Sequence, residues 1–584
     1  MRLEGGLAGR MDTTKTWMET VGKVGLVLLV ALLVIVSYLM YHAGRFKGIS
    51  DINAMDYGQV ARNLANGDGY TTKIVRPLSL ARVPRIEKHP ELTLSPVHPW
   101  IAAQFMKLMP DDSRALALSC GLGFLLTAPV VFFLGWQFFD IRTGYLATAL
   151  YATNLLLLGY SISGLETTWL CLWVSLLFLV LHALARKQRW RLVLATIAGL
   201  LMGLIYLTQV LWIVVLPLIA IYILVSSDRL GRWTTLLVFL VVFAVVIAPW
   251  CVRNVNVVGD PFFNFRAAES IMGTRTHPGN TLYRQFIDEY PSWPWYVLDR
   301  PVEILEKLRD GIAALYNVLP GIAGLYVTPF FLVAVIVTLG PRAFERMRYL
   351  WYSIFIVMAI ALALVSPDTR QLAPLAPFAI VIAAGFFLRL LNARIDEPVE
   401  ERRMRLLRIG MGVLLVINAL PVGLELFRFR EITPDQRMLI GTAQSAREVT
   451  ATTTGPILTD APWTIAWFGD RTAIWLPKTR GDLRNMEDKV GKIRWMLLTP
   501  AVANPALDAT ERMLKEWGPA YAVNLAEDRD FEGYVTSKRL SLGRWVLLEA
   551  DPNAKRDLPP EVLERMQPRE DASGADSPAG GNAQ

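Results

Sequence analysis

Long apolar runs without a formal charge recur along the chain and predict membrane-spanning helices. A bilayer core about 30 Å thick needs roughly 20 apolar residues in helical conformation. The run at 192–227 is too long for one span, and polar Thr208 and Gln209 mark a reversal within it. The pattern therefore predicts about eleven transmembrane helices. The runs are 24–41, 116–139, 143–165, 167–185, 192–227, 233–251, 312–340, 350–367, 371–388 and 409–424.

The basic residues between these runs predict the orientation of the chain. The N-terminal segment 1–23 carries Arg2, Arg10, Lys15 and Lys23. With about eleven spans, the net basic loops fall on the same side as this segment, as cytoplasmic loops do. These basic loops are 186–191, 228–232, 341–349 and 389–408. We therefore expect a multi-pass protein of the cytoplasmic (inner) membrane, with a cytoplasmic N-terminus and outward-facing long loops 44–114 and 252–310.

Composition narrows the class of protein further. Hydrophobic residues make up 53% of the 584-residue chain and charged residues 19%, and the mean hydropathy is +0.36. These values exclude a cytosolic enzyme, a nucleic-acid-binding module and a disordered scaffold. The net charge of +8 is explained by basic loops that set the membrane topology, so it gives no reason to expect a nucleic-acid partner. Cys120, Cys171 and Cys251 lie in or at the end of apolar runs, so they form no disulfide framework.

The composition changes after about residue 428, where short β-type runs alternate with helical patterns. The runs are 456–458, 473–476, 493–498, 520–523 and 545–548, and the helical patterns are 436–449, 482–490 and 507–517. This alternation predicts a small α/β domain with a mostly parallel sheet at 428–552. Asp460 followed by Pro462 indicates a helix start. The Pro-, Ala-, Gly-, Asp- and Ser-rich segment 553–584 is typical of a disordered tail.

The first outer loop contains the most informative polar pattern. Ala54, Tyr57, Ala61, Leu64 and Ala65 fall on one face of a helix. Asp56, Gln59, Asn63 and Asn66 fall on the opposite face, and Gly67 and Gly69 end the helix. Such a helix is expected to lie flat in the membrane interface, with its acids and amides at the outer mouth of the bundle. Asp51 is either a helix N-cap or a functional acid, and Asp56 is either a solvated residue or a functional acid.

Several segments together resemble one family of membrane enzymes. Residues 51–70 and the Pro-Val-His-Pro-Trp stretch at 96–100 resemble the start of a polyprenyl-phosphate-sugar-dependent glycosyltransferase of family 39. This superfamily contains the dolichyl-phosphate-mannose protein mannosyltransferases and the aminoarabinose lipid A transferases. Ser161–Thr167, Pro249–Asn254 with Gly259–Pro261, and Arg370–Pro377 resemble further turns of the family, in the same order and on matching sides.

The resemblance implies a mainly α fold: a polytopic C-type bundle at 24–427 with the small C-terminal α/β domain outside the membrane. It also implies inverting transfer of a hexosyl or pentosyl unit from a polyprenyl phosphate to a lipid, glycan or protein hydroxyl. The family's first-loop acid usually lies four residues before the Tyr, where this chain has Asn53. Asp51 and Asp56 flank that position and are the two candidates for the base, with Asp51 slightly favoured.

Other residues are candidates for binding the substrates. A phosphate leaving group needs cations, and Arg253 and Arg370 lie at outer ends of spans. Arg253 is equally well explained as an interface anchor, whereas Asp368 and the prolines around Arg370 indicate a cavity-lining turn. Arg266, Arg275, Arg284, Arg76, Arg82, Arg85 and Lys88 are weaker candidates.

Glu166 either contacts a substrate or caps the fourth span. The resemblance adds Tyr57, Asn63 and His98 as binding residues. A divalent metal is an open alternative, although no ligand spacing specifies one. A transporter or lipid flippase and a non-catalytic envelope-assembly protein are the competing functions. Few charges within the spans and no visible repeat argue against transport.

Overall fold

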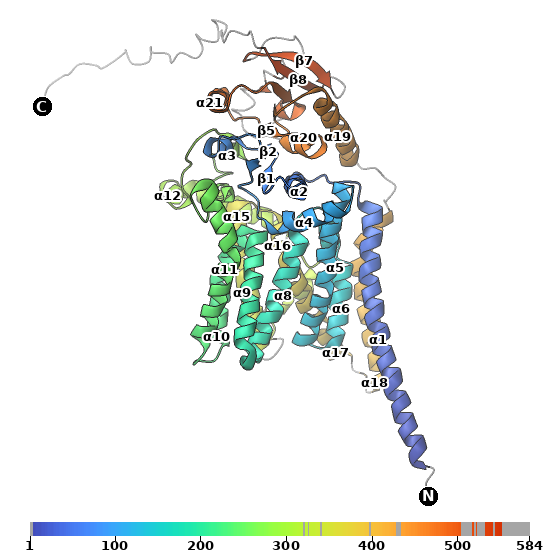
Figure 1. The fold of residues 1–584 in the computed structure, drawn as a ribbon. Helices are drawn as coiled ribbons and strands as arrows, with labels where there is room; N and C mark the ends of the chain where they lie inside the picture. Colours follow the sequence, from blue (N-terminus) through green and yellow to red (C-terminus); the bar gives the residue numbers. More distant parts are fainter. Residues whose placement is uncertain are drawn as a thin grey trace, which may run out of the picture.

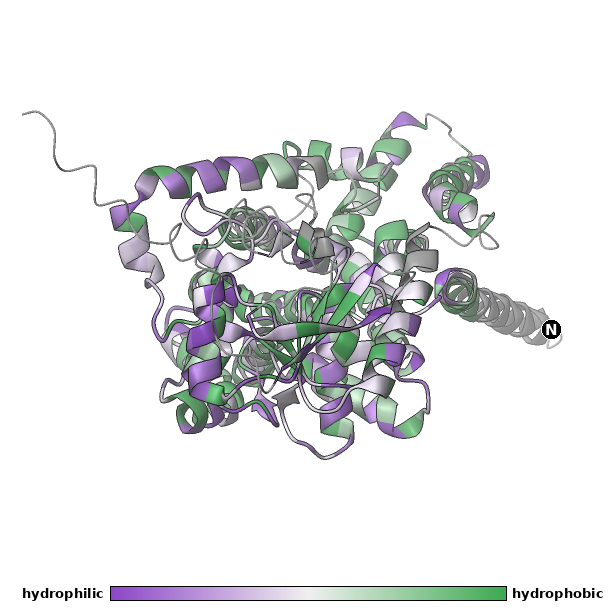
Figure 2. Cartoon of the chain, turned by 90° about the horizontal axis from the view of Figure 1, so that it is seen from above, coloured by the Kyte–Doolittle hydropathy of each residue, from purple (hydrophilic) through white to green (hydrophobic). Residues whose placement is uncertain are grey.

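The protein is a helical bundle capped at one end by an outer layer of loops and a sheet (Figure 1). The computed structural model describes residues 4–318, 322–324, 326–338, 342–395, 397, 399–427, 434–503, 517–518, 521, 532–540 and 544–551. Seen from above (Figure 2), the strands at the centre of the outer layer are largely hydrophobic. Hydrophilic residues gather on the helices and loops around these strands.

Eight helices in the described part of the chain are long and apolar enough to cross a membrane, so this is a multi-pass membrane protein. The spans are Val24–Arg45, Asp112–Phe138, Thr167–Arg186, Gln188–Thr208, Arg232–Val258, Phe344–Val365, Arg370–Arg394 and Glu400–Phe427. They belong to the helices α1 (Glu4–Arg45), α5 (Asp112–Phe138), α8 (Thr167–Arg186), α9 (Arg191–Thr208), α11 (Arg232–Val258), α15 (Arg342–Val365), α17 (Ala376–Arg394) and α18 (Glu400–Phe427).

The remaining predicted runs form shorter helices. Residues 143–165 are divided into α6 (Ile141–Ala152) and α7 (Leu155–Ser161), because Asn154 caps a new helix start. After α9 the chain continues through the 3₁₀ helix η2 (Val210–Val215) into α10 (Leu216–Ser226), so a helix does end at Thr208 as predicted. The run 312–340 contains α14 (Thr328–Ala334) and several residues outside the described set. The count of about eleven spans therefore stays a prediction.

The outer loops are ordered into short elements. The first holds α2 (Ile52–Ala65), α3 (Pro77–Arg82) and α4 (Val97–Leu108), with β1 (Thr71–Thr72), β2 (Ile74–Val75) and β3 (His89–Pro90). The second holds η3 (Phe265–Ser270), η4 (Thr281–Arg284), α12 (Trp293–Asp299) and the start of α13 (Pro301–Val318). The short α16 (Thr369–Leu372) and η6 (Ala373–Leu375) precede α17, and η1 (Gln188–Trp190) precedes α9.

The C-terminal region forms an α/β unit whose sheet includes a strand from the first outer loop. Its elements are α19 (Pro434–Thr452), β4 (Ile457–Thr459), α20 (Pro462–Phe468), β5 (Ala473–Trp475), α21 (Arg480–Val490), β6 (Trp495–Leu498), η7 (Pro500–Ala503), β7 (Tyr534–Leu540) and β8 (Trp545–Ala550). The order is β2-β5-β4-β6-β8-β7, in which β2, β5, β4 and β6 run parallel and β8 and β7 are antiparallel. The first loop is thereby built into the outer domain.

Four of the predicted strands match β4, β5, β6 and β8, whereas β7 was not predicted. The predicted elements 507–517 and 520–523 lie almost wholly outside the described residues. The helix start predicted at Asp460 and Pro462 is confirmed, since α20 begins at Pro462, but Asp460 does not cap it: the N-cap residue is Ala461 and no side chain makes a capping hydrogen bond. The Asp460 carboxylate instead accepts hydrogen bonds from the backbone N–H (3.0 Å) and hydroxyl (2.6 Å) of Thr499.

Helix α2 is buried on both faces, so the interpretation of Asp56 as a solvated residue is wrong. It packs against α4 on one side and α20 of the outer domain on another. A Cβ at Gly58 would lie 2.5 Å from the Trp467 ring, so only glycine permits this close approach. The Arg62 guanidinium lies 4.5 Å from the centroid of the Trp467 ring. After α2, Gly67 and Gly69 adopt positive φ, as expected of residues that end a helix.

Candidate active site

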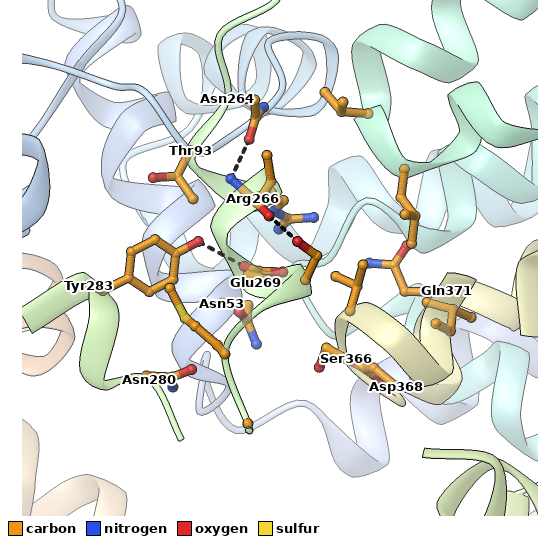
Figure 3. Close-up of a pocket in the computed structure, with 18 of the residues that line it drawn as sticks. Asn53, Thr93, Asn264, Arg266, Glu269, Asn280, Tyr283, Ser366, Asp368 and Gln371 are labelled. Atoms are coloured by element: carbon orange, nitrogen blue, oxygen red, sulfur yellow. Dashed lines mark hydrogen bonds between the residues drawn. The ribbon is translucent and has the colours of Figure 1, made fainter. Parts of the chain in front are cut away.

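A cavity of about 940 Å³ lies between the outer ends of the spans, the two outer loops and the C-terminal domain. Its walls come from α2, the loop around Thr93, the Gln209 turn, η3, α13 and the segment before α17. Trp463 and Trp475 of the outer domain complete it. Figure 3 shows the polar side chains that line this space, among them Asn53, Arg266, Glu269 and Asp368. The cavity therefore joins residues from distant parts of the sequence.

A buried ion pair occupies the α2 side of this cavity. Asp56 Oδ2 is paired with Arg76, and both side chains are almost fully buried. The other carboxylate oxygen, Oδ1, accepts only a long hydrogen bond of 3.4 Å from Gln59 Nε2 among the described residues. Burial raises the pKa of Asp56, while the charge of Arg76 opposes this shift. Asp56 is thus a carboxylate with one oxygen anchored and one nearly free.

A second set of charged groups lies around the Gln209 turn. Arg266 Nη1 donates a hydrogen bond of 2.6 Å to Gln209 Oε1, and Gln209 Nε2 donates one of 3.2 Å to Glu166 Oε1. Glu166 is the N-cap residue of α8, as the sequence suggested, but its side chain makes no capping hydrogen bond. Glu166 instead orients Gln209, which in turn holds the Arg266 guanidinium at the cavity.

Polar atoms in this region are left without partners within the described chain. They are the Tyr57 hydroxyl, Glu166 Oε2, Arg266 Nε and Arg370 Nη1. Arg370 lines the cavity from α16, and its Nε lies 2.7 Å from Asp368 Oδ2. Burial raises the pKa of Tyr57, so its hydroxyl stays protonated and able to donate. Buried polar groups normally have partners, so this cluster points to a polar ligand.

The sequence-predicted residues divide into those at the cavity and those that support it. Asp56 and Arg370 line the cavity. Asp51 is exposed and caps α2 through hydrogen bonds from the Asn53 and Ala54 backbone N–H groups (2.7 and 3.2 Å). Arg253 lies outside the lining: its Nη2 donates to the Glu91 carbonyl at 2.6 Å, and its guanidinium stacks on Tyr70 and Trp250.

Asn63 and His98 have supporting contacts. Asn63 Nδ2 donates to the Thr71 carbonyl at 3.0 Å and so joins α2 to β1. His98 Nε2 lies 2.9 Å from the Gly164 carbonyl, and the His98 ring packs edge-on against Tyr57. Gly164 has φ +84°, and a Cβ there would crowd Ile49, Leu116 and Ala54. His98 thereby holds the turn that presents Glu166.

Comparisons with known proteins agree with this architecture. Residues 88–252 match the model of the dolichyl-phosphate-mannose-protein mannosyltransferase family. The chain is similar to ArnT from Cupriavidus metallidurans bound to undecaprenyl phosphate, at 13% identity and a TM-score of 0.55, over 91% of this chain and 98% of that one. It is also similar to the oligosaccharyltransferase of Archaeoglobus fulgidus, at 13% identity and a TM-score of 0.52, over 87% and 72% of the two chains. No curated protein sequence matches.

The chain has the C-type glycosyltransferase fold. The fold class predicted from the sequence resemblance, a membrane helical bundle with a small C-terminal α/β domain, is confirmed, whereas the number of spans and the side on which the domain lies stay predictions. At such low identity the likeness is one of fold alone.

Among the residues that the structure describes, no set of side chains is arranged to hold a metal ion. No three His, Cys, Asp or Glu side chains gather there at metal-binding distances. His98 faces the Gly164 carbonyl and Asp56 is paired with Arg76.

Several residues that line the cavity were not recognised as candidates in the sequence, or were only weak candidates. Gln209 was noted only as a polar residue at a reversal, and Lys307 and Glu269 gave no signal. Arg76 and Arg266 were weak candidates among many outer-loop cations. Position relative to the span ends did favour Arg370, but no local pattern separates Arg76 from Arg82 or Arg85.

Lys307 gives the cavity a pH-sensitive charge. Its Nζ donates to the carbonyls of Glu269 and Ser270 at 2.7 and 2.9 Å, and burial lowers its pKa to about 8. Lys307 therefore loses its charge as the pH rises from 7 to 9, whereas a phosphate monoester, with a second pKa near 6, stays doubly charged. We expect the affinity of the cavity for a simple phosphate monoester, such as an alkyl phosphate, to fall about tenfold over this range. Lys307→Arg should keep the affinity constant, and titrations at pH 7, 8 and 9 check this; an equal fall in both proteins would contradict it.

Proposed function

We propose that this protein is a membrane glycosyltransferase that moves a sugar from a polyprenyl-phosphate donor to an acceptor hydroxyl, with inversion at the sugar. The observation that carries the proposal is a cavity at the span ends that combines a buried carboxylate, Asp56, with two arginines bearing unpartnered N–H groups among the described residues, Arg266 and Arg370. The similarity to ArnT bound to undecaprenyl phosphate supports the same class of donor.

The proposed step is a single displacement. The acceptor hydroxyl oxygen forms a bond to the anomeric carbon of the donor sugar, and the bond from that carbon to the phosphate oxygen breaks. The electron pair leaves with the polyprenyl phosphate, whose growing negative charge Arg266 and Arg370 offset. The hydroxyl proton passes to Asp56, whose Oδ1 carries only the long bond from Gln59 among described residues. Arg76 holds the other oxygen and so orients the carboxylate.

The charge pattern of the loops supports one side of the membrane for the proposed reaction. The short basic loops support a cytoplasmic N-terminus. The proposal therefore has the cavity and the C-terminal domain facing the outer side of the cytoplasmic membrane. A donor carrying a hexose or pentose and a lipid, glycan or protein acceptor fit this placement. Tyr57 and Glu166 do not line the cavity, so we assign them to the support of Arg266 and Arg370, with which they interact electrostatically.

A transfer assay tests the proposal. The full-length protein in lipid nanodiscs is incubated with undecaprenyl phosphates carrying radiolabelled mannose, glucose, galactose or arabinose, and with membrane extract as the source of acceptor. We expect release of undecaprenyl phosphate and transfer of label from at least one donor. Binding of each donor is measured in parallel without acceptor. A protein that neither turns over nor binds any of these lipids would contradict the proposal.

A further inference from the structure

Two tryptophans of the outer domain form an aromatic wall of the cavity. Trp463 lies on α20 and Trp475 on β5, and both line the cavity with the loop residues described above. Their rings meet edge to face, with centroids 4.7 Å apart and an interplanar angle of 73°. Trp475 is buried, whereas Trp463 is only half-buried. Trp463 is therefore the ring that offers surface to a ligand, and Trp475 supports it.

This wall is rigidly placed relative to Asp56. The Arg284 guanidinium lies 5.4 Å from the centroid of the Trp475 ring, and Arg284 Nε donates to the Leu476 carbonyl at 2.8 Å. One turn after Trp463, Trp467 packs against Gly58 of α2, two residues beyond Asp56. The outer domain and the carboxylate thus keep one spacing, as a binding platform requires.

The wall lies on the side of the cavity away from the membrane. The view in Figure 1 places α20 and β5 above α2, and α16, which carries Arg370, at the end of the bundle below it. With the donor phosphate at Arg370, an in-line displacement brings the acceptor hydroxyl from the opposite side, past Asp56. The body of the acceptor then lies against the outer domain, while a polyprenyl tail extends toward the bundle.

We infer that Trp463, supported by Trp475, is the platform for a sugar ring of the acceptor, so that the acceptor is a glycan or glycolipid. The apolar C–H face of a sugar packs on the face of an aromatic ring, and its hydroxyls need polar groups at the edge. Tyr283 lies in one hydrophobic cluster with both tryptophans, and its hydroxyl donates to Glu269 at 3.0 Å. Tyr283 and Glu269 both line the cavity and supply such groups. This inference rests on the proposed function, because it takes the cavity to be the transfer site.

The test is saturation-transfer-difference NMR of the full-length protein in nanodiscs with methyl α-mannoside, methyl α-glucoside, methyl α-galactoside and methyl α-arabinofuranoside. We expect at least one glycoside to show saturation at its ring C–H protons. Trp463→Ala should lower its affinity about fivefold, and Trp463→Phe, which keeps an aromatic face, should restore most of it. Trp295→Ala is the control, since Trp295 is 68% exposed on α12 and lies outside the lining.

Binding of undecaprenyl phosphate to the same proteins separates failure of the acceptor-platform inference from failure of the proposed function. The inference requires that Trp463→Ala binds this lipid as tightly as the wild type, which also shows that the variant is folded. It is overturned if no glycoside binds the wild type, if Trp463→Ala binds glycosides normally, or if this variant loses lipid affinity in parallel. Failure of the wild type to bind undecaprenyl phosphate would instead count against the proposed function.

Discussion

Asp56→Asn is expected to abolish sugar transfer while leaving donor binding intact. An amide keeps the shape of the side chain but cannot accept the hydroxyl proton, and loss of a general base lowers turnover by about 10²- to 10⁴-fold. Asp56 is the carboxylate that lines the cavity on α2, with Oδ2 on Arg76 and Oδ1 directed to no strong partner within the described chain. The measurement is single-turnover release of undecaprenyl phosphate, with the Kd of the donor determined alongside.

Asp51→Asn is the matched control, because it makes the same change of a carboxylate to an amide five residues earlier in the chain. Asparagine is as good an N-cap as aspartate, so the contacts of Asp51 to the Asn53 and Ala54 N–H groups survive. We expect turnover within about twofold of the wild type. The opposite result, full activity in Asp56→Asn and loss in Asp51→Asn, would assign the base to Asp51.

Removal of one partner of a buried ion pair also costs stability, about 3–5 kcal/mol when the other charge is left unpaired. Asp56→Asn leaves Arg76 in that position. The double variant Asp56→Asn/Arg76→Gln removes both charges and should recover much of the thermal stability. It should remain as inactive as the single variant, which distinguishes a lost base from a misfolded site.

The apolar pattern predicted most of the fold because membrane spans are defined by local composition. Helices α5, α8, α11 and α17 lie where uncharged runs predicted them, and β4, β5, β6 and β8 follow short apolar runs. The pairing of β2 with β5 could not be predicted in this way, because two residues give no periodicity and their partner lies about 400 positions away. Long-range pairing of this kind depends on the assembled domain.

The same limitation explains why the sequence slightly favoured Asp51 over Asp56 as the base. A local helical pattern puts Asp56 on a polar face and Asp51 at a helix start, and nothing within the segment shows that Asp56 is buried. Its burial arises from α20 and from Arg76, which approach through the β2 connection to the outer sheet. Arg370 was favoured correctly as a cavity residue, because its position between two spans is itself a local feature.

Arg370 and Arg253 provide a second comparison, since both are arginines at outer span ends in the sequence. Arg370 lines the cavity and has an Nη1 without a hydrogen-bond partner in the described chain. Both guanidinium arms of Arg253 are engaged, by the Glu91 carbonyl and the Asn254 side chain. Arg370 is therefore available to a phosphate, whereas Arg253 connects α11 to the first outer loop.

Arg370→Gln is therefore expected to weaken binding of undecaprenyl phosphate by about 10- to 100-fold, the value of one charge-assisted hydrogen bond. It should lower kcat as well, because charge on the leaving phosphate grows in the transition state. Arg370→Lys should recover part of the binding but less of the rate, since an ammonium lacks the two-pronged geometry of a guanidinium. In Arg253→Gln we expect a lower Tm with lipid affinity within about threefold of the wild type, because only packing and structural hydrogen bonds are lost. Isothermal titration with undecaprenyl phosphate and thermal melts of all four proteins measure both effects. Equal affinity losses in Arg253→Gln and Arg370→Gln, with both proteins folded, would refute the assignment of the phosphate to Arg370.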